Sequence, residues 1–429
     1  MNDSTMNRYP IAPKHFLNRV KLFSLGLAVV QFIHLSIFAD ARFEDFAMWF
    51  AVHTIIQSSL WMLRIAARHS VSYMNIYWLP LVTLLILSFV TKIYSRIPYM
   101  SSWFAEGLYG TRANMDLGVS GVASYFNIFF YPLAIILAFT ILPKRSYLVA
   151  ISCVIIMCLI DLVFIGTRNA PVFVLLFHFL SAPASYKPTM KSIGIMVLVV
   201  VVFTGIFSYS TIHRSYDSIE GSFDWLTIFE KTGSAQILKI NRNVVEPLSE
   251  YVPAVLPAIF LSHYVSHSIG EMAHLLEIRN EMSFGNLVYL ADQFAGIGLG
   301  SRQYTDWAIE SANPRAGVYQ TIFSSLFFDF GIAGAVLLWL ILLLLISLWH
   351  LLRPNHMSLG VILSSVVIAV GPIENYLYNG LGLAQVLTLF LALFMVQILG
   401  RLVELIPKST FLKTACTQGS KKTYAHTVC

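Results

Sequence analysis

Charged side chains are scarce in this chain. Only 12% of its 429 residues are Asp, Glu, Lys or Arg, while 57% are hydrophobic. A soluble domain carries roughly 25% charged residues, which it needs to cover its surface. The composition therefore excludes an ordinary water-soluble enzyme and predicts a protein whose apolar surface faces lipid.

Several functional signatures are also missing. The chain has no Walker A motif, no Rossmann glycine fingerprint and no G-x-S-x-G motif. No DxD-type acidic pair occurs in the segments that we place outside, which argues against a metal-assisted nucleotide-sugar enzyme. No metal or cofactor is expected. None of the four cysteines falls in an outer segment, so no disulfide framework is predicted.

Long apolar runs predict an all-α, polytopic transmembrane protein that forms a single integral membrane domain over residues 1–429. A helix needs about 20 apolar residues to cross the hydrocarbon core. The sixth run is short and could instead form a re-entrant hairpin. No cleavable signal peptide is expected, because the first run lacks a small-residue cleavage site. We expect ten spans, near residues 20–38, 46–66, 73–92, 121–142, 147–165, 170–183, 192–210, 331–350, 357–373 and 381–400.

The loop charges predict an orientation with both termini in the cytoplasm. Sixteen of the 28 basic residues fall in the segments that this orientation places inside, and the short outer turns hold few. This asymmetry agrees with the positive-inside rule. It also explains the net charge of +6 without a nucleic-acid partner.

Two outer segments are long, near residues 93–120 and 211–318. The second is a large loop between spans seven and eight, with seven Lys or Arg against twelve Asp or Glu. Within it, residues 252–277 predict a helix whose apolar part is too short to span, so we expect it at the membrane surface. Residues 318–349 predict a surface helix, a break at 329–331 and then span eight.

Arginines recur in the expected outer segments, and guanidinium groups bind carboxylates and phosphates through paired hydrogen bonds. They suggest an anionic ligand on that side, although any one of them could be an interfacial anchor. Arg168 has the most informative context: Asn169 is a plausible cap and Pro171 suits a first helical turn, so a helix N-terminus beside Arg168 would favour an anion. The set comprises Arg96, Arg112, Arg168, Arg214, Arg242, Arg302 and Arg315.

Other polar residues admit two interpretations. His213 precedes Arg214 and pairs a possible base with a cation, or simply begins a solvated loop. The stripe of His263, His267, Glu271 and His274 could bind a metal, but a polar helix face near the lipid headgroups is favoured. Asp161 lies within span five and is costly unless paired; we expect an arginine partner.

Three features resemble the oligosaccharide repeat-unit polymerases, the Wzy or O-antigen polymerase family. The first is the architecture of ten or more spans with a large late loop. The second is the turn Gly166-Thr167-Arg168, similar to the Gly/Ser-Arg turn of that family. The third is residues 296–301 (GIGLGS) followed by 321–334 (TIFSSLFFDFGIAG), which resemble the loop end and the "YxDFGxxG" entry into the next span.

The resemblance implies a metal-independent, GT-C-like glycosyltransferase of the bacterial inner membrane. It would polymerise undecaprenyl-diphosphate-linked repeat units at the periplasmic face, for O-antigen or a related lipopolysaccharide or surface polysaccharide. Membrane lipids are further partners, and a chain-length regulator is left open. The expected catalytic residues are Arg168, Arg214, Arg315 and His213, and the expected substrate-binding residues are Arg112, Arg242, Arg302 and Asp329.

Two alternatives remain from the sequence. An O-antigen ligase would move the finished glycan onto another lipid, and a flippase or transporter would only move the lipid-linked oligosaccharide. Transporters commonly show repeated halves and paired charges at the membrane midplane. Repeated halves are not evident here, and the polar residues gather outside, which favours the polymerase.

Overall fold

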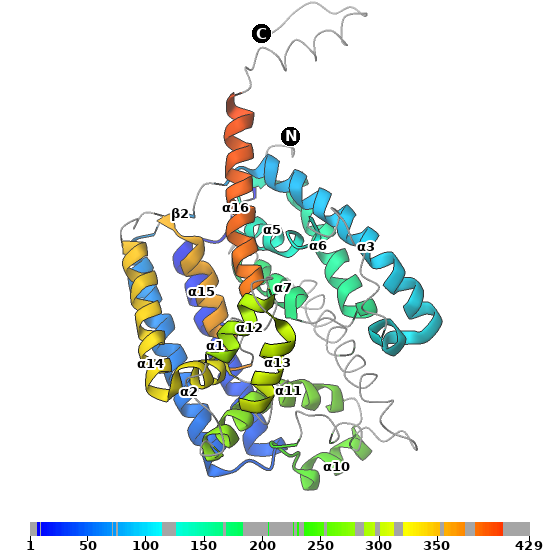
Figure 1. The fold of residues 1–429 in the computed structure, drawn as a ribbon, viewed down its shortest axis with the longest axis vertical. Helices are drawn as coiled ribbons and strands as arrows, with labels where there is room; N and C mark the ends of the chain where they lie inside the picture. Colours follow the sequence, from blue (N-terminus) through cyan, green and yellow to red (C-terminus); the bar gives the residue numbers. More distant parts are fainter. Residues whose placement is uncertain are drawn as a thin grey trace, which may run out of the picture.

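The computed structural model is almost entirely helical (Figure 1). It describes residues 7–8, 10–70, 72–73, 76–113, 126–165, 169–182, 205, 226, 230, 236–252, 255–278, 287–296, 301–312, 321–351, 356–373 and 382–405. Statements about structure below concern these residues. Four two-residue strands occur: β1 (Asn7–Arg8), β2 (Ser72–Tyr73), β3 (Leu142–Pro143) and β4 (His356–Met357). The helices are α1 (Pro13–Ile33), η2 (His34–Phe38), α2 (Phe43–Ala66), η3 (Ala67–His69), α3 (Trp78–Ala113), α5 (Phe130–Leu137), α6 (Lys144–Ile160), η4 (Asp161–Ile165), α7 (Asn169–Ser181), α10 (Arg242–Tyr251), α11 (Leu256–Glu277), α12 (Val288–Gly296), α13 (Arg302–Ala312), α14 (Ile322–Leu351), α15 (Leu359–Val370) and α16 (Gly382–Leu405).

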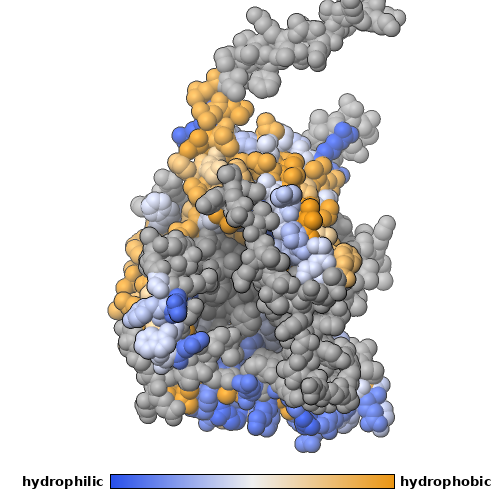
Figure 2. Space-filling view, turned by 45° about the vertical axis from the view of Figure 1, so that its right-hand side comes forward, coloured by the Kyte–Doolittle hydropathy of each residue, from blue (hydrophilic) through white to orange (hydrophobic). Residues whose placement is uncertain are grey.

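Six helical segments in the described part are long and apolar enough to cross a membrane. Large hydrophobic side chains stand exposed along them, as Leu337 of α14 (60%) and Phe394 of α16 (61%) do. Figure 2 shows hydrophobic residues over the upper half of the molecule and hydrophilic ones along its lower edge. These helices indicate an α-helical polytopic membrane protein. The segments are Pro13–Phe38, Phe43–Ala66, Trp78–Phe104, Lys144–Ile165, Ile322–Leu351 and Val386–Leu405.

Segments expected on the cytoplasmic side meet at one end of the bundle. There β1 pairs with β3 and β2 pairs with β4. Arg19 donates to the carbonyl of Ala182 at 2.6 Å, and the hydroxyl of Tyr77 donates to Glu404 at 2.9 Å. β2 and the far end of α16 lie at the top of Figure 1. We call this the strand end.

Segments expected outside meet at the opposite end, which we call the loop end. A backbone bridge joins Ala39 to Ile240, and the amide of Asp40 donates to the carbonyl of Lys239 at 2.8 Å. Arg42 lies 2.8 Å from the carboxylate of Glu277. The turn between the first two spans therefore contacts two separate parts of the 211–318 segment, and α10 and α11 lie at the bottom of Figure 1.

Three expected spans are shorter than a membrane is thick, and one lies almost wholly outside the described residues. The fourth span contains α5, whose eight residues extend about 12 Å at 1.5 Å per residue. α7 has 13 residues and α15 has 12. Of the seventh expected span, near 192–210, only Gly205 is described.

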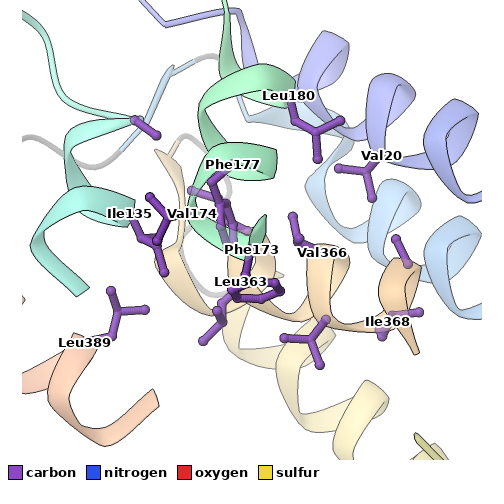
Figure 3. Close-up of a cluster of buried hydrophobic side chains, with 14 of the residues drawn as sticks. Val20, Ile135, Phe173, Val174, Phe177, Leu180, Leu363, Val366, Ile368 and Leu389 are labelled. Atoms are coloured by element: carbon purple, nitrogen blue, oxygen red, sulfur yellow. The ribbon is translucent and has the colours of Figure 1, made fainter. Parts of the chain in front are cut away.

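The short helices share a central position in the bundle. Every residue of α5 is buried, and it contacts α3, α7 and α16. Figure 3 shows Phe173 and Phe177 of α7 beside Ile135 of α5 and Leu363 of α15. Backbone that leaves the helical conformation at membrane depth is tolerated where protein surrounds it, which explains how such short helices can lie here.

One outer segment differs from expectation, and two other predictions for the outer segments are confirmed. The 93–120 segment continues as helix to Ala113, with Pro98 inside α3. The predicted break at 329–331 is confirmed: Gly331 has φ +68° and ψ 173° inside α14. A side chain at this φ is strained, whereas glycine adopts it readily. The helix predicted at 252–277 is also confirmed, as α11, although it begins four residues later, at Leu256.

Candidate functional site

Two membrane helices each end in a five-residue π turn, and each turn begins with a buried polar residue. η2 begins with His34, which is 0% exposed, and η4 begins with Asp161, which is 1% exposed. Ionisable residues within membrane helices are costly unless paired and often mark functional sites. These two residues therefore define two polar centres, which we call the Asp161 centre and the His34 centre.

The Asp161 centre contains one carboxylate and two cations. Oδ1 of Asp161 accepts a hydrogen bond from Nε of Arg96 at 2.8 Å, and Oδ2 lies 3.3 Å from Nζ of Lys92. The hydroxyl of Tyr131 also donates to Oδ2. Lys92 lies 4.6 Å from the ring centroid of Tyr131, a cation–π contact. The expected pairing of Asp161 with an arginine is confirmed.

Lys92 was missed by reasoning from the sequence. A lysine within the apolar run of α3 was a detectable signal, because ionisable residues at membrane depth are rare and usually functional. Lys92 and Arg96 stand one helical turn apart, so both face Asp161 of η4. Arg96 belongs to the centre and is not only an interfacial anchor.

The centre lies close in sequence to the Gly166-Thr167-Arg168 turn. Residues 166–168 lie outside the described residues, but η4 ends at Ile165 and α7 begins at Asn169. Three residues therefore join these helices. Asp161 holds η4 against α3 through its ion pairs. α7 is held in the bundle by its buried side chains Phe173 and Phe177.

The His34 centre joins α1 to α11. Nδ1 of His34 lies 2.8 Å from the hydroxyl of Ser262, and Nε2 lies 3.1 Å from Nδ1 of His263. His263, His267 and Glu271 are at most 1% exposed. The expectation that this stripe faces the lipid headgroups is therefore wrong for these three residues, which face the protein, and His263 contacts His34 of η2. The fourth residue of the stripe, His274, is partly exposed.

A chain of amide and carbonyl contacts extends this centre across the bundle. Oε1 of Gln31 lies 2.6 Å from Nε2 of His53 on α2, and the Gln31 amide donates to the carbonyl of Val265 on α11. The hydroxyl of Ser268 donates to the carbonyl of Pro372, just after α15. Four segments far apart in sequence are thus fixed together at the loop end.

Asp329 has a capping position. It is 0% exposed, and its two oxygens accept the backbone N–H groups of Tyr289 and Leu290 at 2.9 and 2.8 Å. A carboxylate at a helix N-terminus satisfies free N–H groups and the helix dipole. Asp329 therefore joins the start of α12 to α14, just before the Gly331 break. Its expected contact with substrate stays a prediction.

Arg242, another expected substrate-binding residue, pairs with two carboxylates and has a half-exposed side chain. It pairs with Glu230 and, at 3.2 Å, with Glu246 on the next turn of α10. The hydrogen bond from Arg242 to Glu230 raises the pKa of this guanidinium. Its placement on an exposed helix supports an anchoring role for α10.

The remaining expected residues lie at helix ends or outside the described part of the chain. Arg112 lies in the last turn of α3 and Arg302 begins α13, but their side chains are outside the described residues. Arg168, His213, Arg214 and Arg315 lie entirely outside them.

Chemically, the two centres differ. The Asp161 centre carries more positive than negative charge and can attract an anion. The His34 centre carries ring nitrogens and hydroxyls suited to holding α11 in place. Within the described part of the chain, no three His, Cys, Asp or Glu side chains converge as metal ligands. Comparison of the chain with known protein families, with curated proteins and with solved structures gives no match.

Proposed function

We propose that this protein is a metal-independent glycosyltransferase that polymerises undecaprenyl-diphosphate-linked repeat units at the outer face of a bacterial inner membrane. One observation supports the proposal: a buried, cation-rich centre joins Lys92 and Arg96 of α3 to Asp161 of η4, which ends directly before the Gly166-Thr167-Arg168 turn. The GT-C-like arrangement, the periplasmic position of residues 211–318 and the cytoplasmic termini belong to the same proposal.

The chemistry of such a reaction suits this position. The leaving group is a lipid diphosphate, and negative charge grows on its bridging oxygen as the glycosidic bond breaks. Guanidinium groups fixed in advance stabilise that charge in a water-poor site. In the proposal Arg168 acts at this oxygen, with Arg214 and Arg315 beside it. The lipid tail stays in the membrane while the sugars meet in water.

The acceptor sugar hydroxyl needs a base within hydrogen-bond reach. His213, Asp306, Glu310 and Asp329 are the candidates from the sequence. The burial of Asp329 and its two backbone hydrogen bonds favour the other three.

The glycan profile of a deletion strain tests the proposal. A polymerase defect leaves single repeat units on the lipid carrier, whereas a ligase defect leaves long lipid-linked polymer. A flippase defect leaves single units inside the cell. Accumulation of long polymer, or an unchanged profile, would contradict the polymerase assignment.

Arg168→Ala tests the residue. We expect full-length protein in the membrane but only single repeat units, because the leaving group loses its stabilising cation. Arg64→Ala is the matched control, since Arg64 is an exposed arginine near the strand-end terminus of α2. Normal chain lengths in the Arg168→Ala strain would remove Arg168 from the mechanism.

A further inference from the structure

The Asp161 centre carries an unbalanced charge. Lys92 is 7% exposed and Arg96 is 21% exposed, and both meet the same carboxylate. Among the described residues, Asp161 is the only acid that contacts either cation. Two cations on one carboxylate leave a net charge of about +1 inside the bundle, where an uncompensated charge is costly.

Arg96 has N–H donors that could bind an anion. Its Nε is used by Asp161, and within the described chain no acceptor meets the two terminal nitrogens. A guanidinium fixed through Nε still presents a planar fork of N–H groups, which matches the oxygens of a phosphate.

A third donor lies on the same face of α3. Trp103 stands seven residues after Arg96, so about two helical turns place it on the same stripe. Its ring packs against Phe164 of η4 with centroids 5.1 Å apart. Its indole N–H is buried and meets no acceptor in the described part of the chain.

The depth of these groups favours an amphipathic ligand. At 1.5 Å per residue from Trp78, Lys92 lies about 21 Å and Arg96 about 27 Å along α3. The hydrocarbon core is about 30 Å thick, so the proposed orientation, with Trp78 at the inner boundary, puts Arg96 near the outer one. Neighbouring Tyr94 and Ile97 are 62% and 53% exposed on the lipid-facing side of the helix.

We infer that Lys92, Arg96 and Trp103 form a binding site for the diphosphate of an isoprenoid lipid, between α3 and η4 at the outer membrane boundary. Lys92 supplies the surplus charge, Arg96 the fork of donors and Trp103 a further N–H. Asp161 is the counter-ion that both cations share, and an asparagine in its place can still accept from Nε of Arg96. The choice of an isoprenoid lipid as the ligand rests on the proposed function. The excess of positive charge at the Asp161 centre does not depend on it.

Binding of farnesyl diphosphate to the full-length protein in nanodiscs tests the site. Lys92→Met is the main variant: it removes the surplus charge and leaves the Arg96–Asp161 pair balanced, so the fold should survive. We expect affinity to fall at least tenfold, about 1.4 kcal/mol. Arg42→Gln, which removes a cation paired with Glu277 at the same end, should stay within about twofold of the parent protein.

Asp161→Asn separates binding from a purely structural role. This change increases the surplus charge, so affinity for farnesyl diphosphate should hold or rise, opposite in direction to Lys92→Met. If both variants lose binding alike while folded, the network is only structural and the inference fails. Should Asp161→Asn not fold, the comparison of Lys92→Met with Arg42→Gln decides.

Two ligand controls identify the anion. Farnesol, which lacks the diphosphate, should not bind at Lys92. Inorganic pyrophosphate should bind at least tenfold more weakly than farnesyl diphosphate; equal affinity would overturn the lipid assignment in favour of a free anion. Unchanged binding in Lys92→Met would overturn the site itself.

The site and the proposed function fail separately. If farnesyl diphosphate binding depends on Lys92 but the deletion strain makes normal glycan, the polymerase proposal fails and the site stands. If the deletion strain accumulates single units but Lys92→Met binds normally, the site fails and the polymerase proposal stands.

Discussion

Asp329→Asn should destabilise the protein through the loss of a helix cap. The carboxylate is fully buried and accepts two backbone N–H groups, from Tyr289 at 2.9 Å and Leu290 at 2.8 Å. Asparagine has a single side-chain oxygen, so one N–H would face an NH₂ group. A hydrogen bond to a charged group contributes about 1.5–3 kcal/mol, and a neutral one about 1 kcal/mol. Losing one bond and weakening the other costs about 3 kcal/mol in total.

Asp292→Asn is the matched control, because Asp292 lies on α12, the helix that Asp329 caps. The Asp292 carboxylate accepts from the hydroxyl of Thr305 at 3.1 Å, and an asparagine oxygen can keep this bond. Its cost should be below about 1 kcal/mol. The assay is the fraction of purified full-length protein that stays monodisperse in detergent after heating through a temperature series.

The two roles of Asp329 predict different results. As a cap, Asp329→Asn lowers the midpoint of thermal inactivation well below that of Asp292→Asn. As a catalytic base, it would abolish polymer formation and leave the midpoint unchanged. A midpoint equal to that of the control would refute the capping argument.

Two further changes test how the helices are joined and bent. His34→Leu removes the hydrogen bonds of His34 with Ser262 and His263, each of which contributes about 1 kcal/mol, so the free energy of unfolding should fall by about 2 kcal/mol; an unchanged unfolding midpoint would show that this centre does not hold α11. Gly331→Ala places a side chain at φ +68°, which costs about 1–3 kcal/mol, and should lower stability in the same assay. Gly26→Ala is its control, because an added Cβ meets nothing within 4 Å and helix propensity favours alanine; equal effects of the two alanines would contradict the strain argument.

Some local structure was predictable because it depends on nearby residues. Apolar runs of sufficient length predicted the helices that now include α1, α2, α6 and α16. The polar and glycine residues at 329–331 predicted the break in α14, since only glycine adopts the observed φ readily.

The candidate site was predictable only in part. Burial of a carboxylate requires a cation, so the partner type of Asp161 followed from its position in an apolar run. The choice of Arg96 and Lys92 did not, because 65 residues separate Arg96 from Asp161 and no periodicity relates them. The catalytic roles of Arg168, Arg214 and Arg315 stay predictions.

The sequence by itself determined that this is a helical membrane protein, because lipid solvation depends on the composition of each segment. Only the tertiary structure decided which helix faces are buried inside the bundle. The stripe on α11 has the composition of a headgroup-facing surface, yet His263 meets His34 from 229 residues away. Likewise, α5 has the composition of a lipid-facing helix, but all eight of its residues are buried. Hydropathy shows whether a segment can be placed in an apolar environment. Packing against helices distant in sequence decides whether that environment is lipid or protein.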